Sequence, residues 1–133
     1  MIVILVALLL SLAAPAQVIT QRTTVHGVSV AVTAGNLGPD ASVWDFAVVL
    51  DSPHRNLPDD LLTSAVLVDP GGRKYKPLIW EGAPAAGDHR AGVLKFIAVK
   101  PRPDWVELRI SRRGEKKPRS FSWFLAGSMM ARN

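Results

Sequence analysis

The sequence predicts an all-β fold, an immunoglobulin-like antiparallel β-sandwich of about seven strands, within a chain of 133 residues. Two observations support this prediction. After Gln17, apolar residues alternate at period 2 in several short segments, and no long segment shows the 3.6-residue period of a helix. Turn sequences rich in Gly and Pro separate these segments. Many short strands with frequent turns in about a hundred residues are typical of such a sandwich.

The expected strands follow from this alternation in chain order. The first, over 28–33, places Val28, Val30 and Val32 on one face, because alternate side chains of a strand point to opposite faces. The second alternates in the same way from Trp44 to Leu50. Further strands are expected at 64–69, 73–80, 93–99, 104–111 and 119–125. The inward residues of the last two are Val106, Leu108 and Ile110, then Phe121, Trp123 and Leu125.

Turn sequences separate these strands. Residues 35–39 contain two glycines and a proline, and residues 69–72 form a tight Asp-Pro-Gly-Gly turn. Residues 100–103 carry two prolines, and residues 113–115 turn the sixth strand into the seventh. Residues 57–63 favour one helical turn, because proline is tolerated in the first turn of a helix.

The N-terminal segment 1–16 is apolar and ends in Ala14, Pro15 and Ala16. This small-x-small ending predicts a signal peptide at 1–16, followed by a single β-sandwich domain at 17–125 and a short C-terminal tail at 126–133. The apolar run is shorter than the ~20 residues that a spanning helix needs. No Lys or Arg precedes the run, which departs from the usual pattern of a signal peptide. The alternative is an N-terminal anchor that is not cleaved. We expect an exported bacterial protein, periplasmic or extracellular.

The composition excludes several classes of function. The chain has no cysteine, which excludes disulfides, thiolate metal sites and cysteine nucleophiles. Its 48% hydrophobic and 20% charged content is too apolar for a disordered chain. The sequence contains no H-E-x-x-H motif, no nucleophile elbow and no phosphate-binding loop. We therefore expect a non-catalytic binding module and not an enzyme.

The strand count predicts which loops share an end of the fold. If every connection reverses the chain direction, the loops 52–63 and 81–92 and the hairpin 112–118 lie at one end. All three histidines of the sequence, His26, His54 and His89, then fall towards that end. Loops at one end of a rigid sandwich are the usual place for function. We therefore expect the site at this end.

The histidines and acids at that end predict a metal site. His54, His89 and Asp88 are the candidate ligands, and His26 and Glu81 are further candidates. Imidazole nitrogens and carboxylate oxygens from separate loops suit a zinc or copper ion. No two histidines have a local ligand spacing, so the prediction depends on the loops converging. The alternative is that these histidines are solvated loop residues. The expected function is metal or small-ligand capture by the loops 52–63 and 81–92.

The basic residues predict an alternative function. The formal net charge is +5, and residues 71–133 carry 14 of the 16 Lys and Arg but only five of the eleven acids. Six of these bases surround the hairpin 109–119: Arg109, Arg112, Arg113, Lys116, Lys117 and Arg119. Such a hairpin suits anion binding, in a structural or interaction domain of the cell envelope whose partner is an anionic polymer, a membrane surface or a protein.

Two further interpretations bear on this basic hairpin. Its charges can simply keep the hairpin soluble, or pair with the acidic first half of the chain. Nucleic acid is not an expected partner, because an exported protein is separated from the nucleic acid of the cell. In addition, no aromatic residues interleave with the basic residues of the hairpin.

Between Trp44 and Phe96 the chain resembles a family of small uncharacterised exported bacterial β-sandwich proteins. The matching stretches are Trp44-Asp45-Phe46, Leu67-Val68-Asp69, Trp80-Glu81-Gly82, His89-Arg90 and Gly92-Val93-Leu94. The resemblance implies an exported β-sandwich with paired loops, and it implies no activity. Members carry Thr-His-Ser in the first loop and His-His-Arg in the second, which suits metal binding. This chain differs at both places, with Ser52-Pro53-His54 and Asp88-His89-Arg90.

Overall fold

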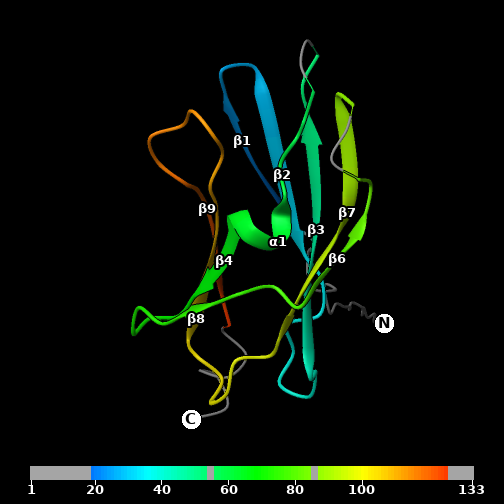
Figure 1. Cartoon of the computed structure of the whole chain (residues 1–133). Coiled ribbons are helices and arrows are strands. Elements are labelled where there is room, and N and C mark those ends of the chain that lie inside the picture. Colours follow the sequence, from blue (N-terminus) through cyan, green and yellow to red (C-terminus); the bar gives the residue numbers. More distant parts are fainter. Residues whose placement is uncertain (1–18, 54–55, 85–86, 126–133) are drawn as a thin grey trace, which may run out of the picture.

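The computed structural model describes residues 19–53, 56–84 and 87–125. Within these ranges the fold is an all-β sandwich of two antiparallel sheets, as Figure 1 shows, and the predicted fold class is confirmed. The segments predicted as a signal peptide, 1–16, and as a tail, 126–133, lie outside the described residues. No helix in the described part of the chain is long and apolar enough to cross a membrane.

The described residues form nine strands and one short helix. In chain order these elements are β1 (Thr20–Val25), β2 (Val28–Ala34), β3 (Val43–Asp51), α1 (Leu61–Ser64), β4 (Ala65–Val68), β5 (Lys74–Tyr75), β6 (Ile79–Gly82), β7 (His89–Ile97), β8 (Trp105–Ile110) and β9 (Arg119–Phe124). One sheet has the strand order β1-β2-β3-β7-β6, and the other has the order β5-β4-β8-β9. The set β2-β3-β7-β6 facing β4-β8-β9 has the strand order of an immunoglobulin constant-type domain, with β1 and β5 added at two edges.

The strand count differs from the seven expected for two reasons. The alternation does not indicate β1, because Val25 is its only apolar residue, yet β1 pairs with β2 along its whole length. The expected strand 73–80 divides into β5, which pairs with β4, and β6, which pairs with β7. Pro77 lies between them and lacks the N–H that a continuous ladder would use. This segment therefore crosses from one sheet to the other.

The core lies between the two sheets and consists of the alternating residues that face inward. Phe46 is fully buried on β3 and contacts the edge of Phe96 on β7, with ring centroids 5.7 Å apart. Trp44 is buried as its alternation predicts, and Trp123 on β9 packs against Phe46 at 5.0 Å. This contact joins the two sheets through aromatic side chains, which contribute more buried area than aliphatic ones.

Two glycines let β6 and β7 approach closely near the end of the sheet. A Cβ atom placed on Gly92 would lie 2.7 Å from the Cα of Gly82 and 2.7 Å from the ring of Trp80. The missing side chains therefore make room for the indole of Trp80 on the inner side of this strand pair. Its Nε1 donates a hydrogen bond to the carbonyl oxygen of Ala83 at 3.0 Å.

One end of the sandwich collects the turns that the sequence placed together. The pairing of Ser29 with Asp51, and of Asp51 with His89, puts the β1–β2 turn, the end of β3 and the start of β7 in one row. In the other sheet, the start of β4, the end of β8 and the start of β9 are aligned in the same way. We call this the loop end, made of the described residues 26–27, 52–53, 56–60, 83–84, 87–88 and 111–118; it points upward in Figure 1.

Candidate functional site

The predicted metal ligands are described only in part. His54 lies outside the described residues. His89 is exposed at the start of β7, and its Nδ1 lies 3.6 Å from Oδ1 of Asp51. Asp88 is also exposed, and its carbonyl oxygen accepts a hydrogen bond from the backbone N–H of Ser52 at 2.8 Å. Among the residues that the structure describes, no three His, Asp or Glu side chains form a group that could hold a metal ion.

The two further candidate ligands lie in different surroundings. His26 is exposed in the β1–β2 turn, where its φ of 51° falls in the left-handed region. Glu81 on β6 forms an ion pair with Lys95 on β7, with 2.9 Å between Oε1 and Nζ. The carboxylate of Glu81 therefore has a cationic partner already.

Arg90 on β7 joins the two loops that were expected to form the site. It is 2% exposed, although its neighbours His89 and Ala91 are both exposed. Its Nη1 donates to the carbonyl oxygens of Leu57 at 3.1 Å and Asp59 at 2.6 Å, and its Nη2 donates to that of Ala83 at 3.2 Å. The guanidinium carbon lies 5.9 Å from the centre of the Trp80 ring, within the range of a cation–π contact.

Backbone hydrogen bonds reinforce this junction. The N–H of Ser52 bonds the carbonyl of Asp88, and the N–H of Leu57 bonds the carbonyl of Gly87, both at 2.8 Å. Leu57 is fully buried below them. The loops 52–63 and 81–92 do meet at the loop end, and their described parts are packed together through Arg90 and these backbone bonds.

A chain of ion pairs crosses the other side of the loop end. Arg119 donates from Nε and Nη2 to the two carboxylate oxygens of Glu115, at 3.0 and 2.6 Å. Glu115 also accepts from Nη1 of Arg112 at 3.2 Å. Arg112 in turn binds both carboxylate oxygens of Asp59, at 2.7 and 3.1 Å. We call Asp59, Arg112, Glu115 and Arg119 the ion-pair chain; their side chains are 5%, 12%, 6% and 2% exposed.

The ion-pair chain connects three segments that are distant in the sequence. Arg119 donates from Nη1 to the carbonyl oxygen of Val28 at 2.8 Å and from Nη2 to that of Val25 at 3.3 Å. It thereby attaches the β8–β9 hairpin to the β1–β2 hairpin of the other sheet. Arg112 attaches the same β8–β9 hairpin to Asp59, which precedes α1.

The electrostatics keep Glu115 and Arg112 charged. Burial by itself would raise the pKa of Glu115, but hydrogen bonds from Arg119 and Arg112, and their positive charges, hold it below its ordinary value of 4.5. The hydrogen bond to Asp59 raises the pKa of Arg112, and its attraction to Asp59 and Glu115 acts in the same direction. Both groups are therefore ionised at neutral pH.

This pairing divides the six basic residues predicted to bind anions. Arg112 and Arg119 belong to the ion-pair chain, and Arg109 donates to Glu107 at 3.1 Å. The other three bases are exposed, and the described part of the chain offers them no ion pair: Arg113, Lys116 and Lys117. The structure thus leaves three of the six cations at the tip of the hairpin, facing solvent.

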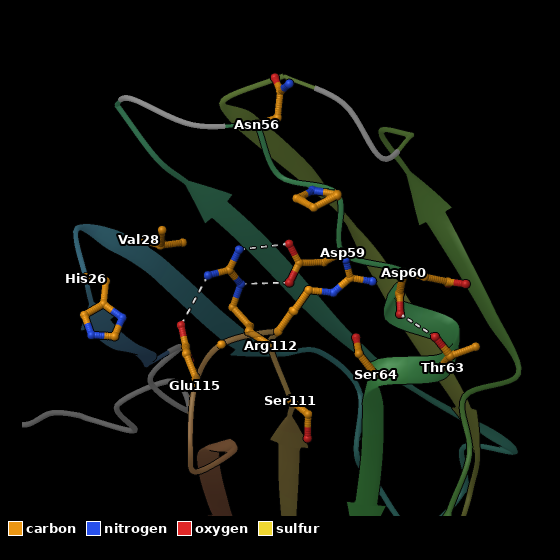
Figure 2. Close-up of a pocket in the computed structure, with 13 residues that line it drawn as sticks. His26, Val28, Asn56, Asp59, Asp60, Thr63, Ser64, Ser111, Arg112 and Glu115 are labelled. Carbon is orange, nitrogen blue, oxygen red and sulfur yellow. Dashed lines mark hydrogen bonds and ion pairs between the residues drawn. The ribbon is translucent and has the colours of Figure 1, made fainter.

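A pocket of about 540 Å³ opens beside the ion-pair chain. Figure 2 shows Arg112 and Asp59 meeting side by side, with Glu115 on one flank and Asp60, Thr63 and Ser64 on the other. The lining comes from the β1–β2 turn, the segment before α1, α1 itself and the β8–β9 hairpin: His26, Val28, Asn56, Pro58, Asp59, Asp60, Thr63, Ser64, Ser111, Arg112, Arg113, Gly114 and Glu115.

Three polar groups of the lining have bonding capacity left. Asp60 is exposed and uses Oδ1 to accept from the N–H of Leu62 at the start of α1, which leaves its second oxygen available. Arg113 is exposed and has no ion pair within the described ranges. The hydroxyl of Ser64 has no hydrogen-bond partner among the described residues. The pocket therefore presents a carboxylate and a guanidinium, whereas the hydroxyl of Ser64 is itself buried.

The sequence contained a signal for both buried arginines. Arg119 occupies the same alternate positions as Phe121 and Trp123, which the alternation places inward. Arg90 likewise shares its parity with Leu94 and Phe96 on β7. An arginine in register with an inward set indicates a buried guanidinium, which needs several acceptors.

Comparison of this chain with protein-family models, with curated proteins and with solved structures finds no match. The resemblance to an exported bacterial family therefore stays a prediction from the sequence. The class that the structure itself defines is an immunoglobulin-like β-sandwich with a polar pocket at its loop end.

Replacing Glu115→Gln should lower the free energy of unfolding at pH 7 by about 3 kcal/mol, because it leaves Arg119 buried without a countercharge. Since folding lowers the pKa of Glu115, the stability it contributes is present above pH 4.5 and is lost as the pH falls through the folded-state pKa. The difference in the free energy of unfolding between variant and wild type should therefore be smaller at pH 3 than at pH 7. Urea unfolding at both pH values measures it.

The matched control is Glu107→Gln, which breaks the ion pair with Arg109 on the more exposed outer face of β8. This change should cost less than about 1 kcal/mol at pH 7. Equal losses of unfolding free energy in the two variants would show that Glu115 contributes no more stability than the acid of an exposed ion pair.

Proposed function

We propose that the chain is an exported, non-catalytic binding module that captures a small polar ligand in the pocket at the loop end. The observation that carries this proposal is the pocket of about 540 Å³, whose two walls are fixed to each other by buried ion pairs. Ligand sites are usually concave, largely preformed and of this size, with a few polar groups that orient the ligand. Export rests on the sequence of residues 1–16.

The free groups of the pocket favour a zwitterionic ligand. Asp60 can accept from an ammonium group, and Arg113 can donate to a carboxylate. The charges of Asp59, Arg112 and Glu115 are matched within the ion-pair chain, so they add little net attraction for either sign. A free amino acid, or the terminus of a short peptide, has the chemistry and the size that this lining suits.

Two features favour binding over catalysis. The hydroxyl of Ser64 has no hydrogen-bonded base among the described residues, whereas a serine nucleophile needs one within reach. Most charged side chains of the lining are committed to ion pairs that hold the walls.

Small-ligand capture is better supported than zinc or copper capture. Within the described residues the metal hypothesis has His89 and its neighbour Asp51, with both side chains about 60% exposed. Two ligands are fewer than the three protein ligands that a catalytic zinc site uses, and structural sites use four. The pocket, in contrast, is lined by thirteen described residues.

Isothermal titration calorimetry against free amino acids and dipeptides tests this proposal. At least one zwitterion should bind the wild type saturably. Asp60→Asn should weaken it tenfold or more, because a charge-assisted hydrogen bond to the ammonium group is lost. Asparagine can still cap α1, so the fold should be retained.

The control for this experiment is Asp40→Asn, which changes an exposed aspartate in the loop at the opposite end. It should bind like the wild type. The proposal is contradicted if no zwitterion binds the wild type at millimolar concentration, or if Asp60→Asn binds with unchanged affinity.

A second candidate function follows from the three exposed cations at the hairpin tip. Arg113, Lys116 and Lys117 lie within five residues of each other and have no ion pair in the described part of the chain. Such a cluster attracts anionic polymers or anionic lipid surfaces. In this reading the protein is an interaction domain of the cell envelope.

Retention on a heparin column distinguishes this second function. The double variant Lys116→Ser/Lys117→Ser should elute at lower salt than the wild type, because two exposed charges are removed. Neither lysine lines the pocket, so capture of a zwitterion should not change. The control Lys74→Ser/Lys76→Ser removes two exposed lysines elsewhere. If both double variants elute at the same salt concentration, net charge alone governs retention and the hairpin is not a specific surface.

A further inference from the structure

The outer face of the five-stranded sheet carries small apolar side chains at its centre. On β3, Ala47 and Val49 alternate with buried core residues and therefore point outward. On the neighbouring strand β7, Ala91 and Val93 occupy the outward positions. Ala47 and Ala91 are exposed, whereas the two valines are half-buried. Ala31 on β2 lies beside Val49 on the same face, but it is buried, at 7% exposed.

Charged side chains border this apolar centre on the same two strands. On β3, Asp45 and Asp51 lie on either side of it, and on β7 Lys95 and His89 do the same. An apolar centre with a polar border is typical of protein–protein interfaces. The pocket at the loop end includes none of these residues, and the outer surface of a sheet suits a second sheet better than a small ligand.

The register between β3 and β7 makes each cross-strand row complementary. Val49 lies beside Ala91, and Ala47 lies beside Val93, so a larger and a smaller side chain share each central row. On either side of these central rows, an acid lies beside a base: Asp45 beside Lys95, and Asp51 beside His89. Beyond Asp45, Val43 lies beside Ile97, and both are apolar.

We propose that this face binds a second copy of the chain, related by a twofold axis that runs along the strands between β3 and β7. This rotation places β3 of one copy over β7 of the other. Each residue of β3 then lies over the β7 residue with which it pairs within its own sheet. Each valine then lies over an alanine of the other copy, and each outward aspartate lies over Lys95 or His89. Aligned packing of two sheets at about 10 Å brings such side chains into contact.

The available area is consistent with a reversible dimer. The four strands that would face each other across this axis, β2, β3, β7 and β6, lie about 4.8 Å apart and have four to nine residues, which gives a face of roughly 500 Å². A standard interface buries about 800 Å² per partner, so this one belongs to the smaller class. We therefore expect association at micromolar concentration and not a permanent dimer.

The proposed axis has a functional consequence. A twofold axis along the strands puts the loop ends of both copies at the same end of the dimer. The two pockets would then face the same way, and a ligand displayed repeatedly on a surface would be held at two points. The dimer does not depend on the proposed ligand, so either proposal can fail without the other.

Sedimentation analysis of the protein produced from the full chain tests the dimer, between about 1 and 200 μM. The wild type should dimerise within this range. Ala47→Arg and Ala91→Arg should each weaken dimerisation tenfold or more, because each places a charge in the apolar centre. The control Ser122→Arg adds the same side chain at an exposed outward position of the other sheet, opposite Glu107, and should behave like the wild type.

Circular dichroism of each variant separates a loss of dimerisation from a loss of folding, and only folded variants are compared. A wild type that stays monomeric throughout the range overturns the proposal. Folded Ala47→Arg and Ala91→Arg variants that dimerise like the wild type overturn it as well.

Single-cysteine variants test the axis, because the chain has no cysteine of its own. His89→Cys and Val43→Cys lie at opposite ends of the β3–β7 row pattern. With the proposed axis, a short bismaleimide should cross-link each variant to itself and should not cross-link a mixture of the two. Cross-linking only between the two different variants would overturn the proposed symmetry.

Discussion

The guanidinium group of Arg119 is buried at the loop end, and acceptors from separate segments surround it. Moving a guanidinium out of water is costly unless its charge is balanced and its donors are bonded. Glu115 balances the charge, and carbonyl oxygens of the β1–β2 hairpin accept the remaining bonds. The β8–β9 hairpin must therefore fold back over the end of the core. Its position then fixes Arg112, and Arg112 in turn holds Asp59.

This arrangement explains how a pocket can persist in a small sandwich. Its two walls come from the segment before α1 and from the β8–β9 hairpin, which are about fifty residues apart in the sequence. Loops at the end of a sandwich have few apolar contacts of their own, so other interactions must hold them. Here the bidentate Asp59–Arg112 pair joins the walls, and Arg90 bonds the segment before α1 to Ala83 after β6.

The charge asymmetry of the sequence has a structural use. The acidic first half contributes Asp59, and the basic second half contributes Arg112 and Arg119. Asp59 pairs with Arg112 across the two halves, whereas Arg119 and Arg109 pair with Glu115 and Glu107 of their own half, and these pairs neutralise part of the positive charge of the hairpin. Of the six bases of the hairpin, only Arg113, Lys116 and Lys117 have no ion pair among the described residues, so a count of six overstates what that surface offers an external anion.

Alternation was sufficient to predict the sandwich, because one buried face imposes period 2 on every long strand. It did not indicate β1, whose residues are mostly polar and whose place depends on pairing with β2. The loop end was predictable from strand parity, whereas the pairing of its arginines was not. Whether an arginine faces solvent or a carboxylate depends on where Glu115 and Asp59 lie after folding, which is tertiary information.

A double-mutant cycle between the two ends of the ion-pair chain tests whether its four residues stabilise the fold as one unit. Asp59 and Arg119 are its terminal members and are connected through Arg112 and Glu115. Asp59→Asn, Arg119→Met and the double variant are compared by urea unfolding at pH 7. We expect a coupling free energy of about 1 kcal/mol or more between Asp59 and Arg119. Additive effects, within about 0.5 kcal/mol, would contradict it.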